Sequence, residues 1–182
     1  MAVLETVLQP SGEADGKHHI LNTTHNQSIL WLMEQRPFDA TCFGKILHHM
    51  DPNANDQGIG YLIHTVVGSQ NPEALEMLLA RGASTDVPHW VKGNNLIHTL
   101  IGTYNQFNPG HTVEGQLKCL DILLAHGLDK DAQNEQGFTP LHLAIEDGQV
   151  DMADRLLNKG SKLTQKMVNS FLDDMFGDLS PG

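Results

Sequence analysis

Apolar residues in the central part of the chain recur at the spacing of short helices with one buried face. Residues 62–67 carry such a pattern, with Leu62 and Val66 one helical turn apart. A second apolar stretch at 75–79 is followed by Gly82, a residue type that often ends a helix. A single pair of short helices cannot bury both apolar faces, so each pair must stack on its neighbours. The pattern therefore predicts an all-α fold built from stacked helix pairs.

The same arrangement occurs three times along the chain. In each copy a histidine near the start of the first helix is followed by a Leu-Leu pair and then by a glycine. The histidine and the glycine are 18 residues apart at 64–82 and again at 142–160. They are 29 residues apart at 98–127, so 11 residues are inserted between the two halves of the middle copy. Because the other intervals agree so closely, we interpret the three segments as repeats of one structural unit.

The last repeat resembles the ankyrin repeat. The residues that carry this resemblance are Thr139, Pro140, Leu141, His142 and Gly148. A Leu-Leu-x-x-Gly pattern, also typical of that family, occurs at 78–82, 123–127 and 156–160. The resemblance covers residues 57–163 and implies an ankyrin-repeat solenoid of about four helix-turn-helix units. It also implies a structural role for the repeat histidines, which in this family hydrogen-bond locally and tie neighbouring repeats together.

An array over residues 26–163 follows from this similarity, with an atypical first unit and an insertion near 103–116 in the third. The units are expected at about 26–55, 56–88, 89–130 and 131–163. Thr164 is a suitable N-cap for a capping helix within 164–182, a segment that also includes a tail. Residues 1–25 form an amino-terminal segment whose pattern fits either a short helix or a strand.

The net charge of the chain argues against some classes of partner. The 22 acidic and 11 basic residues give a formal net charge of -11. Such a surface repels nucleic acid and anionic membranes, because both attract clustered lysine and arginine. No stretch is long and apolar enough for a membrane span, and residues 1–10 lack the basic start of a signal peptide. We therefore expect a cytoplasmic protein.

The sequence contains none of the common catalytic or phosphate-binding motifs, so we expect neither an enzyme nor a bound cofactor. Histidines gather at 18–25 and at 48–49, yet neither group has a recognised metal-ligand spacing. Lys118 could lower the pKa of the adjacent Cys119 thiol. The apolar surroundings of both cysteines instead favour reduced thiols in the core.

The family resemblance also implies where a partner binds. Ankyrin arrays bind through the turn tips between repeats and through the exposed side of the first helices. Turn tips are expected near 52–56, 86–92 and 130–136. The exposed positions four and five residues after each histidine are small or acidic, which favours a partner segment with basic groups. The candidate contact residues on the tips, the first helices and the inserted loop are His89, Trp90, Lys92, Tyr104, Phe107, Asn134, Gln136, Glu146 and Asp147.

Two of these candidates have a competing structural interpretation. Trp90 stands on a turn tip where the array has no obvious need for it, and tryptophan is a frequent interface anchor. It could instead fold back on the neighbouring turn. The inserted loop with Tyr104 and Phe107 is equally compatible with binding and with tolerated drift in loop length.

These observations predict a non-catalytic protein-protein interaction module that acts as a monomeric, cytoplasmic adaptor or inhibitor. Two alternatives fit the same array. The chain could be a bacterial or viral effector that binds a host protein in the host cytosol, and its asparagine- and glutamine-rich composition is compatible with that. It could also be the targeting domain of a larger enzyme or scaffold.

Overall fold

The computed structural model of the protein describes residues 38–56, 60–89, 93–103 and 112–169. In these ranges short helices alternate with turns. The helices are α3 (Ala40–His48), α4 (Leu62–Gly68), α5 (Pro72–Ala80), α6 (Leu96–Gly102), α7 (Val113–Ala125), α8 (Pro140–Glu146) and α9 (Val150–Asn158). Strands β1 (Asn55–Asp56) and β2 (Gly60–Tyr61) form a short antiparallel ladder, and residues 165–169 are again helical.

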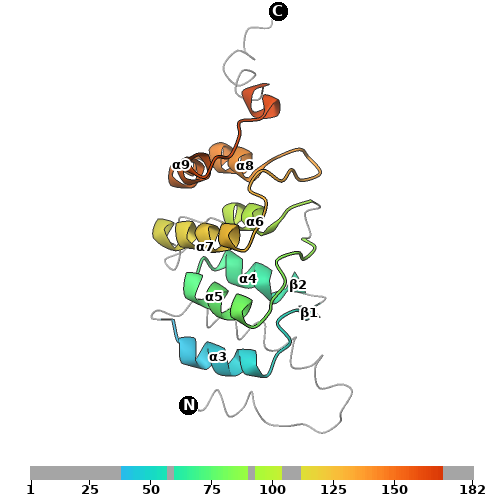
Figure 1. Ribbon diagram of the computed structural model, residues 1–182, viewed down its shortest axis with the longest axis vertical. Helices are drawn as coiled ribbons and strands as arrows, with labels where there is room; N and C mark the ends of the chain where they lie inside the picture. The colour runs from blue at the N-terminus through green and yellow to red at the C-terminus, as the bar shows by residue number, and fades with distance from the viewer. Residues whose placement is uncertain (1–37, 57–59, 90–92, 104–111, 170–182) are drawn as a thin grey trace, which may run out of the picture.

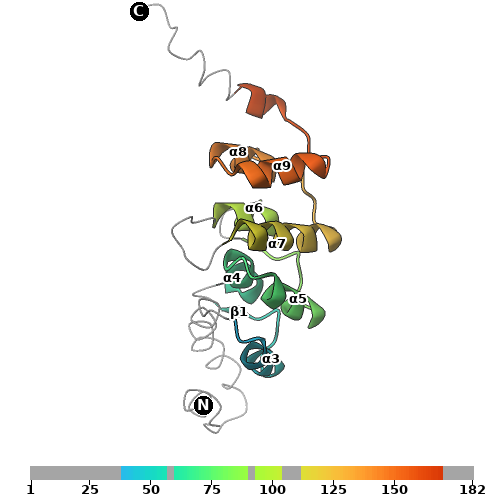
Figure 2. The ribbon, with the colours of Figure 1, turned by 90° about the vertical axis from the view of Figure 1, so that its left-hand side faces the viewer.

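The helices form an elongated stack of two layers (Figure 1). Helix α4 packs against α5, α6 against α7 and α8 against α9, so each repeat contributes one inner and one outer helix. The inner helices α4, α6 and α8 contact one another in order, as do the outer helices α3, α5, α7 and α9. Figure 2 shows the same order from another side. The predicted helical solenoid is thereby confirmed, while the predicted first half of the earliest unit lies outside the described residues.

The inner helices α6 and α8 begin with polar caps, whereas α4 follows Tyr61 and has no side-chain cap. At α8 the Oγ1 of Thr139 accepts a hydrogen bond from the His142 backbone N–H at 3.2 Å, and Pro140 follows at the first helical position. Helix α6 lacks the Thr-Pro pair but starts in the same way. The Oδ1 of Asn95 accepts from the backbone N–H of His98 at 3.2 Å. The substitution that makes this repeat hard to recognise in the sequence therefore preserves the capping chemistry.

The outer helices α5, α7 and α9 share one type of end. After α5, the N–H of Ala83 donates to the carbonyl of Leu78 at 3.3 Å, and Gly82 takes a left-handed φ of 84°. This is a common helix C-cap, in which the left-handed position favours glycine. Gly127 and Gly160 occupy the equivalent positions with the same φ. The Leu-Leu-x-x-Gly pattern of the sequence is thus the signature of a helix end.

The core is a continuous column of aliphatic side chains that runs through the stack. The inner helices α4, α6 and α8 have only 7 residues each, and isolated helices of that length do not form in water. Burial between neighbouring repeats therefore stabilises them. The buried side chains on the inner helices and at the Leu-Leu pairs include Leu62, Ile63, Val66, Val67, Leu78, Leu96, Ile97, Leu100, Ile101, Leu123, Leu141, Ala144 and Leu156.

Two repeat histidines connect each repeat to the following one. The Nε2 of His64 lies 3.0 Å from the carbonyl oxygen of Pro88, and the Nε2 of His98 lies 3.0 Å from that of Phe138. Both histidine rings are buried. An N–H donor on Nε2 gives the carbonyl group of the next turn a hydrogen-bond partner, and a buried carbonyl without a partner would destabilise the fold. The geometry shows the structural role that the family resemblance implies for these two residues.

Stability is expected to decline as the pH falls below 6.5. Burial lowers the pKa of His64 and His98 from their ordinary value of 6.5, more than their hydrogen bonds to carbonyls raise it. The unfolded chain then binds more protons than the folded chain in mild acid. The free energy of unfolding is therefore level above the ordinary pKa and decreases as the pH falls from there toward the lower folded-state pKa. Urea denaturation followed by circular dichroism, from about pH 7.5 to about pH 5, would measure this decline.

A single substitution tests the cause of that decline. His98→Gln should make it shallower, because glutamine does not titrate and can still donate to the Phe138 carbonyl. His126→Gln is the matched control, since His126 is exposed at the end of α7. An equally steep decline in His98→Gln and the wild type would rule out burial of this ring as a cause.

Two features differ from the predicted pattern. The turn before α4 contains the β1–β2 ladder, in which Asn55 pairs with Tyr61, so the array is not purely helical. The insertion is also partly helical, because α7 has 13 residues where α5 and α9 have 9 each, a difference of 4. Residues 113–116 therefore form an extra helical turn, capped by Thr112, and not a loop. Residues 104–111 of the insertion lie outside the described residues.

The helix after the last repeat begins where the sequence predicts a capping helix. The Oγ1 of Thr164 accepts a hydrogen bond from the Met167 backbone N–H at 3.3 Å. The Met167 side chain is buried against the core cluster, so the start of this helix covers part of the end of the stack. The predicted continuation over 170–182 lies outside the described residues.

Candidate partner-binding surface

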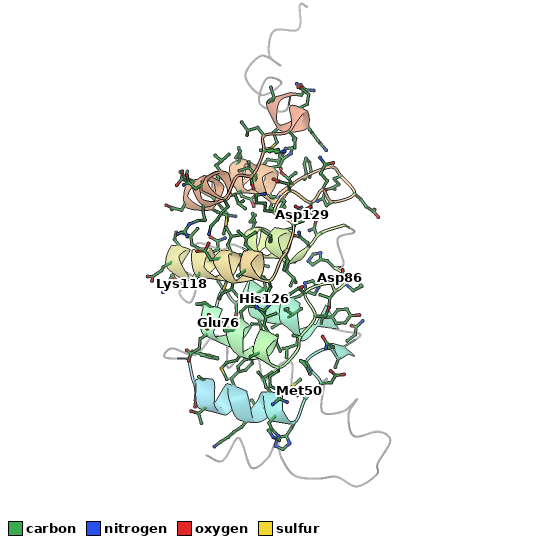
Figure 3. All side chains as sticks on the ribbon, viewed as in Figure 1. Met50, Glu76, Asp86, Lys118, His126 and Asp129 are labelled. Atoms are coloured by element: carbon green, nitrogen blue, oxygen red, sulfur yellow. The ribbon has the colours of Figure 1, made fainter. Side chains whose placement is uncertain are left out.

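The two sides of the stack expose different elements. Figure 3 shows Asp86 and Asp129 on the side of the turns, and Glu76 and Lys118 on the outer helices at the other side. Each turn connects an outer helix to the next inner helix, so the turn tips adjoin the starts of α6 and α8. Of the described candidate residues, His89, Asn134 and Gln136 lie in these turns, whereas Glu146 and Asp147 lie at the carboxy-terminal end of α8.

In the first two complete repeats the inner helices end in small, uncharged residues. The positions that follow the histidine by four and five are a glycine and then Ser69 or Thr103. The Ser69 hydroxyl donates to the carbonyl of Val66 at 2.7 Å, and the Thr103 hydroxyl donates to that of Thr99 at 2.8 Å. Both hydroxyls are thus used within their own helix. At this position these two repeats can contact a partner by shape but present no charged side chain to it.

The last repeat has Glu146 and Asp147 at the same positions, and both residues are exposed. The Oε1 of Glu146 lies 3.4 Å from the Nε2 of His142, and the Oδ2 of Asp147 accepts from the Gln149 amide at 3.4 Å. Both contacts are long, so much of each carboxylate remains open to solvent. The two residues also stand at the carboxy-terminal end of α8, where the helix dipole disfavours negative charge. Such local conflicts are more frequent at functional sites than elsewhere.

Asn134 organises the turn tip before α8. Its Oδ1 accepts hydrogen bonds from the backbone N–H groups of Gln136 and Phe138 at 3.0 Å each, and its Nδ2 donates to the Asn94 side chain at 2.9 Å. The Asn134 side chain is only 6% exposed. Its polar groups form hydrogen bonds within the array, so we remove Asn134 from the candidate contact residues. Gln136, by contrast, is exposed at the tip.

Two further tip residues belong to this surface although the sequence analysis does not single them out. Glu135 is exposed, and the half-buried ring of Phe138 stands edge to face against His142 with centroids 4.4 Å apart. The Phe138 carbonyl accepts from the backbone N–H of Asn134 and lies 3.0 Å from the Nε2 of His98. An aromatic residue directly after the tip glycine is the sequence signal that could have identified this position.

Asp131, in the same turn, forms hydrogen bonds within the array. Its Oδ2 accepts from the Lys130 ammonium at 3.0 Å, and its Oδ1 accepts from the backbone N–H of Lys162 at 3.2 Å. Burial by itself would raise the pKa of Asp131, but the hydrogen bonds from Lys130 and Lys162 and the charge of Lys130 outweigh it and lower the pKa. The ionised carboxylate therefore links the turn to the segment after α9.

Gln136, Glu146 and Asp147 are all exposed in the last repeat, Gln136 on the turn tip before α8 and the two acidic residues at the other end of that helix. His89 lies at the preceding turn, with its ring 5.0 Å from that of His64 and edge to face with it. The remaining candidates Trp90, Lys92, Tyr104 and Phe107 lie outside the described residues. Their contribution to binding stays a prediction.

In 38–56, 60–89, 93–103 and 112–169, no group of three His, Cys, Asp or Glu side chains is placed to hold a metal ion. Burial raises the pKa of the Cys119 thiol to about 12, so this thiol stays protonated and unreactive at neutral pH. No helix in this part of the chain is long and apolar enough to cross a membrane. What the described residues do offer is an extended surface for contact.

Comparison with known proteins relates this array to others. A family model described as ankyrin repeats (3 copies) matches residues 63–167. The human ARF GTPase-activating protein GIT2 is 26% identical over 118 residues, which cover 65% of this chain and 14% of that protein. Human protein phosphatase 1 regulatory subunit 27 is 39% identical over 49 residues, or 27% of this chain and 32% of that protein. A putative ankyrin repeat protein of fowlpox virus is 31% identical over 86 residues, or 47% of this chain and 22% of that protein.

The chain therefore spans less than a third of the length of each of these relatives. The part matched by the family model runs from α4 to the helix that follows α9. The similarity concerns the repeat array, and what each relative does as a whole is a separate question.

Proposed function

The chain belongs to the ankyrin-repeat family, and we propose that it binds a basic segment of a partner protein through the inner side of its last repeat. Ankyrin repeats are protein-interaction modules, and the family is generally non-catalytic. The proposed contact surface comprises the turn tip at 135–138 and the carboxy-terminal end of α8. In this proposal the protein acts as a monomer in the cytoplasm.

The observation that carries the proposal is the placement of acidic side chains at both ends of α8. Glu135 lies on the tip before the helix, Glu146 and Asp147 lie at its end, and all three are exposed. Helix α8 alone has 7 residues and is about 10 Å long, so an extended peptide of more than about three residues is needed to reach from the tip to the end of the helix. The carboxy-terminal ends of α4 and α6 are uncharged, so the last repeat alone, among these three described repeats, has acidic groups both on its tip and at the end of its inner helix.

Removing the two carboxylates at the end of α8 is expected to weaken partner binding. For the double variant Glu146→Gln with Asp147→Asn, we expect affinity to fall by about three- to tenfold at low salt. The loss should shrink at high salt, because mobile ions screen exposed charges. Capture of partners from a cell lysate, quantified by mass spectrometry, would identify the ligand. Titration of the captured partner at two salt concentrations would then measure the effect.

A matched control removes the same charge from the outer side. Asp151→Asn with Asp154→Asn changes two exposed carboxylates on α9. This variant should bind as the wild type does. An equal loss in both variants would mean that only the overall charge matters, and failure to capture any protein would argue against the binding function itself.

The proposed biological role is that of an adaptor or an inhibitor. A surface that occupies a partner without performing chemistry suits both, and one relative is named as a regulatory subunit of protein phosphatase 1. An inhibitor would lower the activity of the captured partner in a purified assay. An adaptor would leave that activity intact and recruit a second protein.

Two other roles have some support. The similarity to a fowlpox virus protein favours an effector that acts on a host protein, and capture of a partner from animal-cell lysate but not from bacterial lysate would support it. The match to a small part of GIT2 favours a targeting domain within a larger enzyme or scaffold. In that case the captured partner would bind the array without any change in its own activity.

A further inference from the structure

We infer that the last turn tip contains a binding site for one arginine or lysine side chain of the partner, and that Lys166 of the same chain occupies it in the free protein. The inference rests on the proposed function, because it names a chemical group that the acidic surface would recognise. It is carried by the contact between the Lys166 ammonium and the ring of Phe138.

The Lys166 side chain is held by two different kinds of group. Its Nζ lies over the face of the Phe138 ring, 3.9 Å from the centroid. The same Nζ donates a hydrogen bond to the carbonyl of Gln136. The side chain passes across Gly137, where an added methyl group would lie 3.6 Å from Nζ. An aromatic face next to a carbonyl oxygen is an arrangement suited to an ammonium or guanidinium ion.

The site is held in place by contacts that do not involve Lys166. Asn134 accepts hydrogen bonds from the backbone N–H groups of Gln136 and Phe138, which sets the shape of the tip. His142 supports the Phe138 ring from its edge, with centroids 4.4 Å apart. Because none of these contacts needs the lysine, the aromatic face and the carbonyl would stay in position after Lys166 leaves.

The Lys166 side chain can leave this site while its backbone stays in place. Thr164 caps its helix and Met167 is buried, so the backbone of Lys166 is held beside the tip while its side chain is exposed. Within the described part of the chain, Lys166 forms no ion pair. A partner arginine is a strong competitor, because its planar guanidinium stacks on an aromatic ring while it donates several hydrogen bonds.

Emptying the site should strengthen binding of a basic ligand. The probe is a fluorescently labelled synthetic peptide of alternating glycine, serine and arginine, titrated against the wild type and Lys166→Ala. We expect Lys166→Ala to bind the peptide about two- to fivefold more tightly, the range that an exposed cation–aromatic contact spans. In an NMR titration, the backbone N–H signals of Gln136 and Phe138 should shift on addition of the peptide, and more so in the variant.

Three controls separate the site from overall charge. Lys162→Ala removes the same charge from a nearby exposed lysine and should leave the affinity close to that of the wild type. A peptide with citrulline in place of arginine keeps the shape of the side chain without its charge, and should show no gain. Phe138→Leu keeps an apolar residue but removes the aromatic face, so adding it to Lys166→Ala should cancel the gain. Circular dichroism would verify that each variant is folded.

The outcomes distinguish this site from the proposed function. Equal affinity of Lys166→Ala and the wild type, or an equal gain in Lys162→Ala, would overturn the inference. If the double variant Glu146→Gln with Asp147→Asn still weakens peptide binding in that case, the proposed function survives and only the cation site is lost. If the peptide binds to neither the wild type nor Lys166→Ala, both the site and the basic partner are refuted.

Discussion

Replacing Leu156 with alanine is expected to lower the free energy of unfolding by about 2–5 kcal/mol. Leu156 is 0% exposed and, with Met152, is one of the buried residues through which α9 contacts the core. Its truncation removes aliphatic contacts and leaves a cavity, because the packing between repeats can relax only in part. Urea denaturation at neutral pH, followed by circular dichroism, would measure the loss.

The adjacent residue is a matched control for that experiment. Leu157→Ala makes the same chemical change one position later, but the Leu157 side chain is 45% exposed, so we expect a loss below about 1 kcal/mol. Helix propensity changes equally in both variants, and the difference between them therefore isolates burial. Leu141→Ala should behave like Leu156→Ala, because Leu141 is also 0% exposed. Similar losses at 156 and 157 would show that the orientation of α9 on the core is wrong.

Gly93→Ala is expected to lower the free energy of unfolding by a similar amount, about 2–5 kcal/mol, for a different reason. Gly93 has a φ of 77°, a left-handed conformation that costs a residue with a side chain about 1–2 kcal/mol. An added methyl group would also lie 2.7 Å from the backbone nitrogen of Glu135 and 2.9 Å from the Cα of Asn134. Relieving this overlap requires one turn tip to move relative to the next, at a typical cost of about 1–3 kcal/mol. The same urea denaturation would measure it.

Gly82→Ala separates the two terms. Gly82 has a comparable φ of 84°, but no atom lies within 4 Å of a methyl group built there, so only the conformational cost of about 1–2 kcal/mol should remain. Because the overlap at Gly93 is with residues 134–135, Gly93→Ala should also displace the proposed contact surface and weaken partner binding. Equal losses of stability in the two glycine variants would show that the close approach of the tips contributes nothing.

The sequence and the structure agree on parts of the candidate surface and differ on others. Counting from the repeat histidine puts Glu146 and Asp147 at the end of the inner helix, and both are exposed there, because helix length is constant in the repeat. The same counting cannot show that the Asn134 side chain is hydrogen-bonded within the array, because one of its hydrogen bonds goes to Asn94, 40 residues earlier. Polar residues on a turn look alike in a sequence, whether they bind the turn itself or a partner.

By itself, the sequence determines the repeat architecture of this protein and the sign of its charge. The charge follows from composition, and the architecture follows from local requirements: apolar residues at helical spacing, polar caps at most helix starts, and a glycine where the chain must turn left-handed, as at Gly82. Only the tertiary structure decided that the insertion lengthens α7, that Asn134 is buried, and that Lys166 lies on Phe138. These features depend on contacts between different repeats, which no periodic pattern records, because stacking brings together residues whose separation in the chain follows no fixed spacing.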